Sequence, residues 1–136
     1  MKMFFLALTF LLGALPTFSH AAPGPLEPYM ERMQVIQRRM NANIDRIHLT
    51  GQRAQALLDV RNWIANAQEA RRIGPGGSLQ RQRGFRALFD RLIGKLQVLR
   101  SRVNALDSIG AQATLREINA IKNQGHRRFR GYLPPA

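Results

Sequence analysis

The segment FRALFDRLIGKLQVLRSRVNAL, residues 85–106, decides the fold class of this chain. Its large apolar residues recur at spacings of three and four: Phe85, Leu88, Phe89, Leu92, Leu96, Leu99, Val103 and Leu106. This spacing places them on one face of an α-helix, which turns once every 3.6 residues. A helix with a single apolar face is stable only when that face is buried. We therefore predict a helix that begins near Leu79 and packs against other helices.

Three more segments show helical spacing. The first runs from about Pro28 to Ile47, with its apolar face at Met30, Met33, Ile36 or Gln37, Met40, Ile44 and Ile47. The second runs from about Gln52 to Arg72, with a buried side predicted at Ala54, Leu57, Leu58, Ile64, Ala65 and Ala67. The last runs from about Ala111 to Phe129, with Leu115, Ile118, Ile121, Gly125 and Phe129 toward the core.

The segments between these helices are short and rich in turn residues, at residues 48–51, 73–78 and 107–110. No segment alternates apolar and polar residues as a strand would. Four helices of similar length with short connections predict an all-α, antiparallel up-down-up-down four-helix bundle.

The N-terminus has the pattern of a secretory signal peptide. A positive start at Lys2 precedes the apolar run from Met3 to Leu15, which is too short for a membrane span of ~20 residues. We place the cleavage after Ala21, so that residues 1–21 are removed and residues 22–136 form one domain. The expected location is the periplasm, without stable membrane insertion once the signal is gone.

Two features of the composition bear on function: the absence of cysteine and a strong positive net charge. The chain has no cysteine, which excludes disulfides, zinc–thiolate sites, iron–sulfur clusters and covalent haem attachment. Its net charge is +13, and 18 of its 21 basic residues are arginine. Because these arginines are spread along the chain, they read mainly as solvated helix faces, although a basic surface also suits an acidic partner.

The predicted topology brings chemically distinctive side chains to one end of the bundle. The start of the first and third helices and the end of the last helix meet there, with Met30, Phe85, Phe89 and His126. A thioether and an imidazole beside two aromatic rings suit the axial ligation of haem iron. Gly125 would let a flat cofactor approach the helix. His48 belongs to the opposite end, because ~18 residues of helix rise ~27 Å.

Three segments resemble the signature regions of the soluble cytochrome b562 family. They are Leu26-Glu27-Pro28-Tyr29-Met30-Glu31, Phe85-Arg86-Ala87-Leu88-Phe89-Asp90 and Gly125-His126-Arg127-Arg128-Phe129-Arg130. The resemblance implies a four-helix bundle that binds one haem b non-covalently. It also implies Met30 and His126 as axial iron ligands, Phe85 and Phe89 as pocket residues, and Arg130 as an arginine near the haem edge. The chain departs from the family in its strong positive charge and in having Gly125 before the histidine.

Met33 competes with Met30 for the ligand role, since it lies one turn away on the same helix face. We prefer Met30 because it completes a Leu-Glu-x-x-Met pattern and lies nearer the end of the bundle. Met33 is then expected to line the haem pocket.

The expected function is that of an exported, monomeric b-type cytochrome that carries single electrons and is not an enzyme. No set of residues suited to hydrolysis converges at that end. The expected partner is a redox protein, one with an acidic surface, and not nucleic acid. The alternative is a haem-free basic bundle of the cell envelope that binds anionic surfaces or nucleic acid, in which Met30 and His126 would be dispensable.

Overall fold

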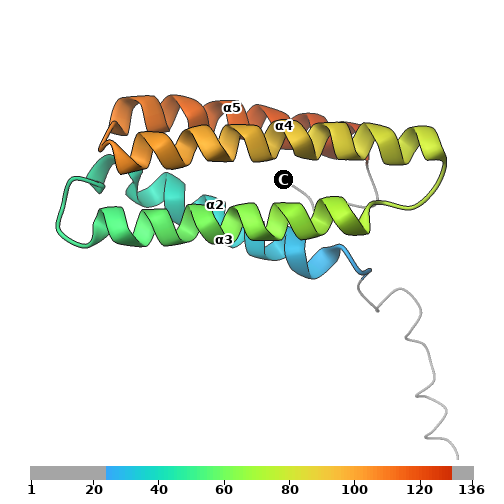
Figure 1. Ribbon diagram of the computed structural model, residues 1–136, viewed down its shortest axis with the longest axis horizontal. Coiled ribbons are helices and arrows are strands. Elements are labelled where there is room, and N and C mark those ends of the chain that lie inside the picture. The colour runs from blue at the N-terminus through green and yellow to red at the C-terminus, as the bar shows by residue number, and fades with distance from the viewer. Residues whose placement is uncertain (1–23, 130–136) are drawn as a thin grey trace, which may run out of the picture.

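Four antiparallel helices form the structure, a computed structural model that describes residues 24–129 (Figure 1). They are α2 (Glu27–Asn43), α3 (Gln52–Ile73), α4 (Leu79–Asn104) and α5 (Ser108–Arg128). A short 3₁₀ turn, η2 (Ile44–Arg46), extends α2. The predicted all-α, up-down-up-down four-helix bundle is confirmed. The predicted signal peptide at residues 1–21 and Arg130 lie outside the described residues.

Local sequence signals account for where the helices begin and end. The Ser78 hydroxyl accepts a hydrogen bond from the Arg81 backbone N–H at 3.1 Å and thereby caps α4. Asp107 caps α5 in the same way, accepting from the Gly110 backbone N–H at 2.9 Å. At the end of α3, Gly74 has a φ of 73°, a left-handed conformation that glycine adopts without steric cost.

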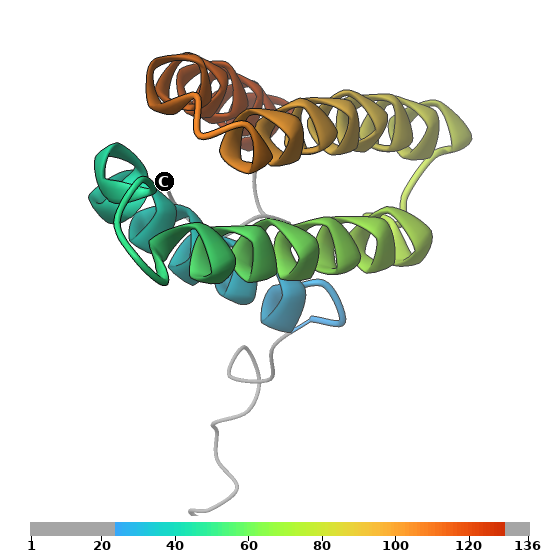
Figure 2. The ribbon, with the colours of Figure 1, turned by 60° about the vertical axis from the view of Figure 1, so that its left-hand side comes forward.

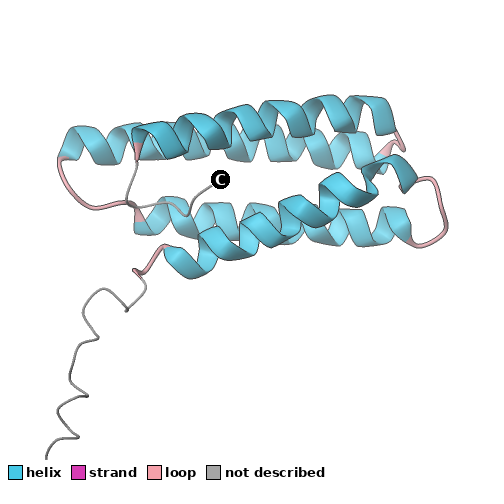
Figure 3. Ribbon diagram, turned by 180° about the vertical axis from the view of Figure 1, so that it is seen from behind, coloured by secondary structure: helices cyan, strands magenta, loops and turns pink. Residues whose placement is uncertain are grey.

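The bundle is closed at one end and open at the other along the seam between α2 and α5. Each helix packs on the next in chain order, but α5 meets the first helical segment mainly through η2. Seen from two sides, α2 leans away from α5 toward its N-terminal end (Figures 1 and 3). Figure 2, turned by 60°, shows the α2–α3 pair facing the α4–α5 pair across the core. The open end carries the predicted ligands.

The buried face of α3 differs from the predicted one. Ala54, Leu58 and Ala65 are exposed and Leu57 is only partly buried, whereas Ile64 and Ala67 are buried as predicted. The core side instead includes Ala56, Asp59, Val60, Trp63 and Ala70. Both sets have helical spacing, so the apolar pattern alone did not distinguish them. The decisive feature is Asp59, which is buried because Arg39 of α2 binds its carboxylate.

Three helix boundaries also differ from the sequence prediction. Helix α2 ends at Asn43, and Ile44 and Ile47 are buried on the 3₁₀ turn and just beyond it. Leu106 lies past the end of α4 with a φ of 59° and is largely exposed. Helix α5 begins at Ser108 instead of Ala111, because the Asp107 cap lets the helix start one turn earlier. None of the helices in residues 24–129 combines the length and apolar character that a membrane span requires.

Candidate functional site

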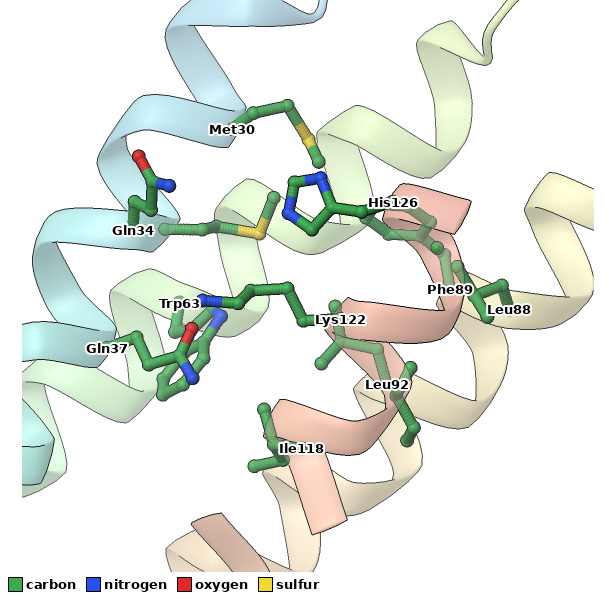
Figure 4. Close-up of a pocket in the computed structure, with 13 residues that line it drawn as sticks. Met30, Gln34, Gln37, Trp63, Leu88, Phe89, Leu92, Ile118, Lys122 and His126 are labelled. Atoms are coloured by element: carbon green, nitrogen blue, oxygen red, sulfur yellow. The ribbon is translucent and has the colours of Figure 1, made fainter. Parts of the chain in front are cut away.

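A pocket opens between α2 and α5 at the open end of the bundle (Figure 4). Its walls are the facing sides of these two helices, and its floor comes from α3 and α4. Including its open mouth, the hollow has a volume of about 530 Å³. Its lining consists of Met30, Met33, Gln34, Gln37, Trp63, Leu88, Phe89, Leu92, Ile118, Ile121, Lys122, Gly125 and His126.

Met30 and His126 line this pocket from opposite walls. Met30 comes from the first turn of α2 and His126 from the last turn of α5. The thioether end of Met30 and the imidazole of His126 point toward one another (Figure 4). Both side chains are partly buried, so each can be reached from the pocket while being held by the helix beneath it. The two predicted ligands are therefore brought together.

The surroundings of His126 favour its neutral imidazole. Burial lowers the pKa of His126 below its usual value, and the nearby charge of Lys122 lowers it further. A neutral imidazole has a nitrogen lone pair available for a metal, whereas the imidazolium has none. The lowered pKa therefore favours the form of His126 that can act as a metal ligand.

Met33 lines the same pocket, one turn along α2 from Met30. It is more deeply buried than Met30, with 6% of its surface exposed. Both thioethers therefore remain available on the α2 wall, and burial alone does not choose between them. Met30 retains the position closer to the mouth and to the end of the bundle.

The two predicted aromatic residues occupy different layers. Phe89 lines the pocket, but Phe85 does not. Phe85 is fully buried behind it, with its ring stacked on Phe89 at 4.5 Å between centroids. The ring of Phe129 meets Phe85 edge-on, with centroids 5.3 Å apart. Phe85 therefore supports the pocket floor through Phe89 and does not itself face the pocket.

Several pocket residues were not predicted from the sequence. Trp63 was missed because the wrong face of α3 was assigned to the core. Lys122 lies four residues before His126, a spacing that puts both on one helix face. That spacing could have placed Lys122 at the site. Gln34 carried no such signal, whereas Gln37 was named on the apolar face of the first helix as an alternative to Ile36.

The residues present fit a haem. The lining is mostly apolar, its polar side chains being Gln34, Gln37, Lys122 and His126. A soft thioether faces the His126 imidazole across the hollow. Gly125 presents bare backbone to the hollow, as expected for the approach of a flat ring. In residues 24–129 no three His, Cys, Asp or Glu side chains cluster, so a conventional metal-ion site is not formed there. His48 is exposed at the closed end.

Comparison with known proteins found no matching family model, no matching curated protein and no matching solved structure.

Proposed function

We propose that this protein is a b-type cytochrome that binds one haem b non-covalently and carries single electrons. The observation that supports it is the position of Met30 and His126 on opposite walls of one apolar pocket. Neither residue type is diagnostic alone, because methionine usually fills cores and histidine often lies near helix C-termini. Their convergence from two helices 96 residues apart in sequence is what a bound ring with two axial ligands requires.

Each part of the pocket has a role in this proposal. Met30 and His126 would hold the iron from its two sides, which leaves no open position for oxygen. Leu88, Phe89 and Leu92 would exclude water from the ring. The iron, when bound, supplies a one-electron couple, and an axial methionine favours a high reduction potential. Because Met30 and His126 would occupy both free positions of the iron, we propose a carrier and not an enzyme.

The cellular setting belongs to the same proposal. Residues 1–21 would direct export to the periplasm and be removed. The net charge of +13 would steer an acidic redox partner toward the protein, at a rate that falls as ionic strength rises. The protein would act as a monomer, with the pocket mouth left accessible to the partner.

Titration of the purified protein with haem tests this function. Trp63 is the single tryptophan of the chain and lines the pocket, so bound haem will quench its fluorescence. We expect saturation at one haem per chain, a low-spin absorption spectrum in both oxidation states, and reversible reduction by one electron. Absence of quenching and of the spectrum would leave the haem-free basic bundle as the better account of the chain.

Three substitutions test the ligands. His126→Ala should weaken haem binding by more than ~100-fold, since the loss of even an outer-shell partner of a metal site costs 10–100-fold. Met30→Leu preserves volume and should turn the low-spin spectrum into a high-spin one. Met33→Leu should leave the spectrum unchanged, and the reverse pattern would assign the ligand to Met33. His48→Ala, at the exposed closed end, is the matched histidine control.

A further inference from the structure

Among residues 24–129, Lys122 is the one lysine or arginine that lines the pocket. Its side chain is partly buried, and it extends from α5 toward α2 across the edge of the hollow (Figure 4). The other residues at this edge are Gln34 and Gln37 of α2. The ammonium group therefore lies beside the polar edge of an otherwise apolar site.

Within the part of the chain that the structure describes, no carboxylate is paired with this ammonium group. Five ion pairs form among residues 24–129, and none of them includes Lys122. The charge of another cation, Arg38 of α2, acts on it electrostatically. Burial and the charge of Arg38 both lower the pKa of Lys122. A partly desolvated cation beside a like charge is unfavourable unless something compensates it.

Lys122 lines the pocket, and the exposed Arg38 of the facing helix α2 acts on it electrostatically. An anion bound at Lys122 would offset the repulsion between these two positive charges. A carboxylate suits this place, because it accepts charge-assisted hydrogen bonds from an ammonium group. The apolar body of the same ligand would then occupy the rest of the hollow. Haem has this amphipathic character, with an apolar ring and two propionate carboxylates.

We propose that Lys122 forms a carboxylate-binding subsite at the α2–α5 edge of the pocket and holds one haem propionate there, with the positive charge of the exposed Arg38 adding to the attraction. This inference rests on the proposed function and adds an orientation to it. One propionate is held between α2 and α5 at Lys122, so the ring enters the pocket in a defined rotation about the Met30–His126 axis.

The comparison of haem with haem dimethyl ester tests this subsite, because the ester keeps the ring and iron but has no carboxylate charge. Trp63 quenching reports the affinity of each without requiring any redox activity. The unaltered protein should prefer haem over the ester by about five- to tenfold, in line with a partly exposed charge pair. Lys122→Met keeps the apolar stem and should remove most of that preference.

Matched variants separate this role from a general effect on folding. Lys122→Arg keeps a cation at the edge and should restore the preference for haem. Lys95→Met removes a lysine that pairs with Glu117 on the surface between α4 and α5, and it should leave the preference intact. Arg38→Gln should lower the preference to a smaller extent than Lys122→Met, because Arg38 is exposed.

The outcomes distinguish the subsite from the function itself. Equal affinity for haem and its ester in the unaltered protein, or a preference that survives Lys122→Met, overturns the subsite and leaves haem binding in place. Failure of both porphyrins to quench Trp63 overturns the proposed function and the subsite together. A preference that disappears with Lys122→Met and returns with Lys122→Arg supports both.

Discussion

Met30 and Met40 belong to the same helix but lie in opposite regions of the bundle. Met40 is 2% exposed within the closed half, whereas Met30 is partly exposed in the wall of the pocket. The same residue type on the same apolar face of α2 thus fills a core in one place and offers a thioether to a hollow in the other. The difference shows that one apolar face of α2 is packed into the core at one end and borders a pocket at the other.

The closed end is held by contacts that the open end lacks. The turn η2 packs against α5, and the Ser108 hydroxyl donates to the Ile44 backbone carbonyl at 3.0 Å. Arg53 of α3 donates to the Asn104 carbonyl at the end of α4, at 3.1 Å. These bonds tie α2, α3, α4 and α5 together near residues 44–53 and 104–108. The α2–α5 seam can therefore open at the other end without unfolding the bundle.

The largest expected effect is a difference in unfolding free energy between the alanine variants of the two methionines. Met40→Ala should lower the free energy of unfolding of the haem-free protein by about 2–5 kcal/mol, the usual cost of a buried methionine truncation. Met30→Ala should lower it by about 1 kcal/mol or less, because the side chain is only partly buried. Urea unfolding followed by circular dichroism measures both values. Equal losses would mean that the pocket wall is packed as tightly as the closed core.

The same two variants should show the opposite order in their effect on haem binding. Met30→Ala should change the spectrum of the bound haem, while folded Met40→Ala should bind haem with the unaltered spectrum. The contrast is most informative below the unfolding transition, where both proteins are folded.

A second prediction concerns the buried carboxylate that fixes the face of α3 in the closed half. Arg39 donates to both Asp59 oxygens at 2.9 and 2.7 Å, and Gln55 donates to one of them at 3.0 Å. Arg39→Ala should cost about 1–3 kcal/mol of unfolding free energy, because it leaves a buried carboxylate with one protein partner. Thermal unfolding of the haem-free protein measures the loss.

Arg61→Ala is the control for that change. It removes an exposed arginine of α3 that forms no ion pair among residues 24–129, and the expected effect is within about 0.5 kcal/mol. If Arg39→Ala cost no more than Arg61→Ala, water would have to reach the Asp59 carboxylate in the folded protein.

The division between the two ends explains what the sequence could predict. Periodicity predicted the four helices and their antiparallel order, since repeated spacing over many residues outweighs any single exception. It also brought Met30 and His126 to one end, because up-down topology fixes which helix ends meet. Periodicity could not predict the buried face of α3, since the burial of Asp59 depends on an arginine from another helix.

Helical spacing was also too coarse to predict which side chains face the pocket. Phe85 stacks behind Phe89 and also meets the ring of Phe129, the residue just past the end of α5, edge-on. The spacing of Phe85 and Phe89 on α4 made both of them look like pocket residues. Met30 and Met33 differ by one turn on one wall, and no local pattern in the chain distinguishes a ligand from its neighbour at that spacing. Lys122 shares a helix face with His126, so its place at the site was predictable from spacing alone.

The smallest expected effect is that of Gly125→Ala, which adds one methyl group at the open end of the bundle. Gly125 is buried within α5 and lines the pocket, so Gly125→Ala adds a methyl beside the hollow. Alanine has the higher helix propensity, and the haem-free protein should gain up to about 1 kcal/mol of unfolding free energy. The same methyl would occupy space needed by the ring, so haem affinity should fall.

Gly94→Ala is the matched control, because its Cβ on α4 would meet nothing within 4 Å. It should stabilise the protein to a similar extent and leave Trp63 quenching by haem unchanged. Loss of haem affinity in both variants would show that helix stiffness, and not space in the pocket, controls binding.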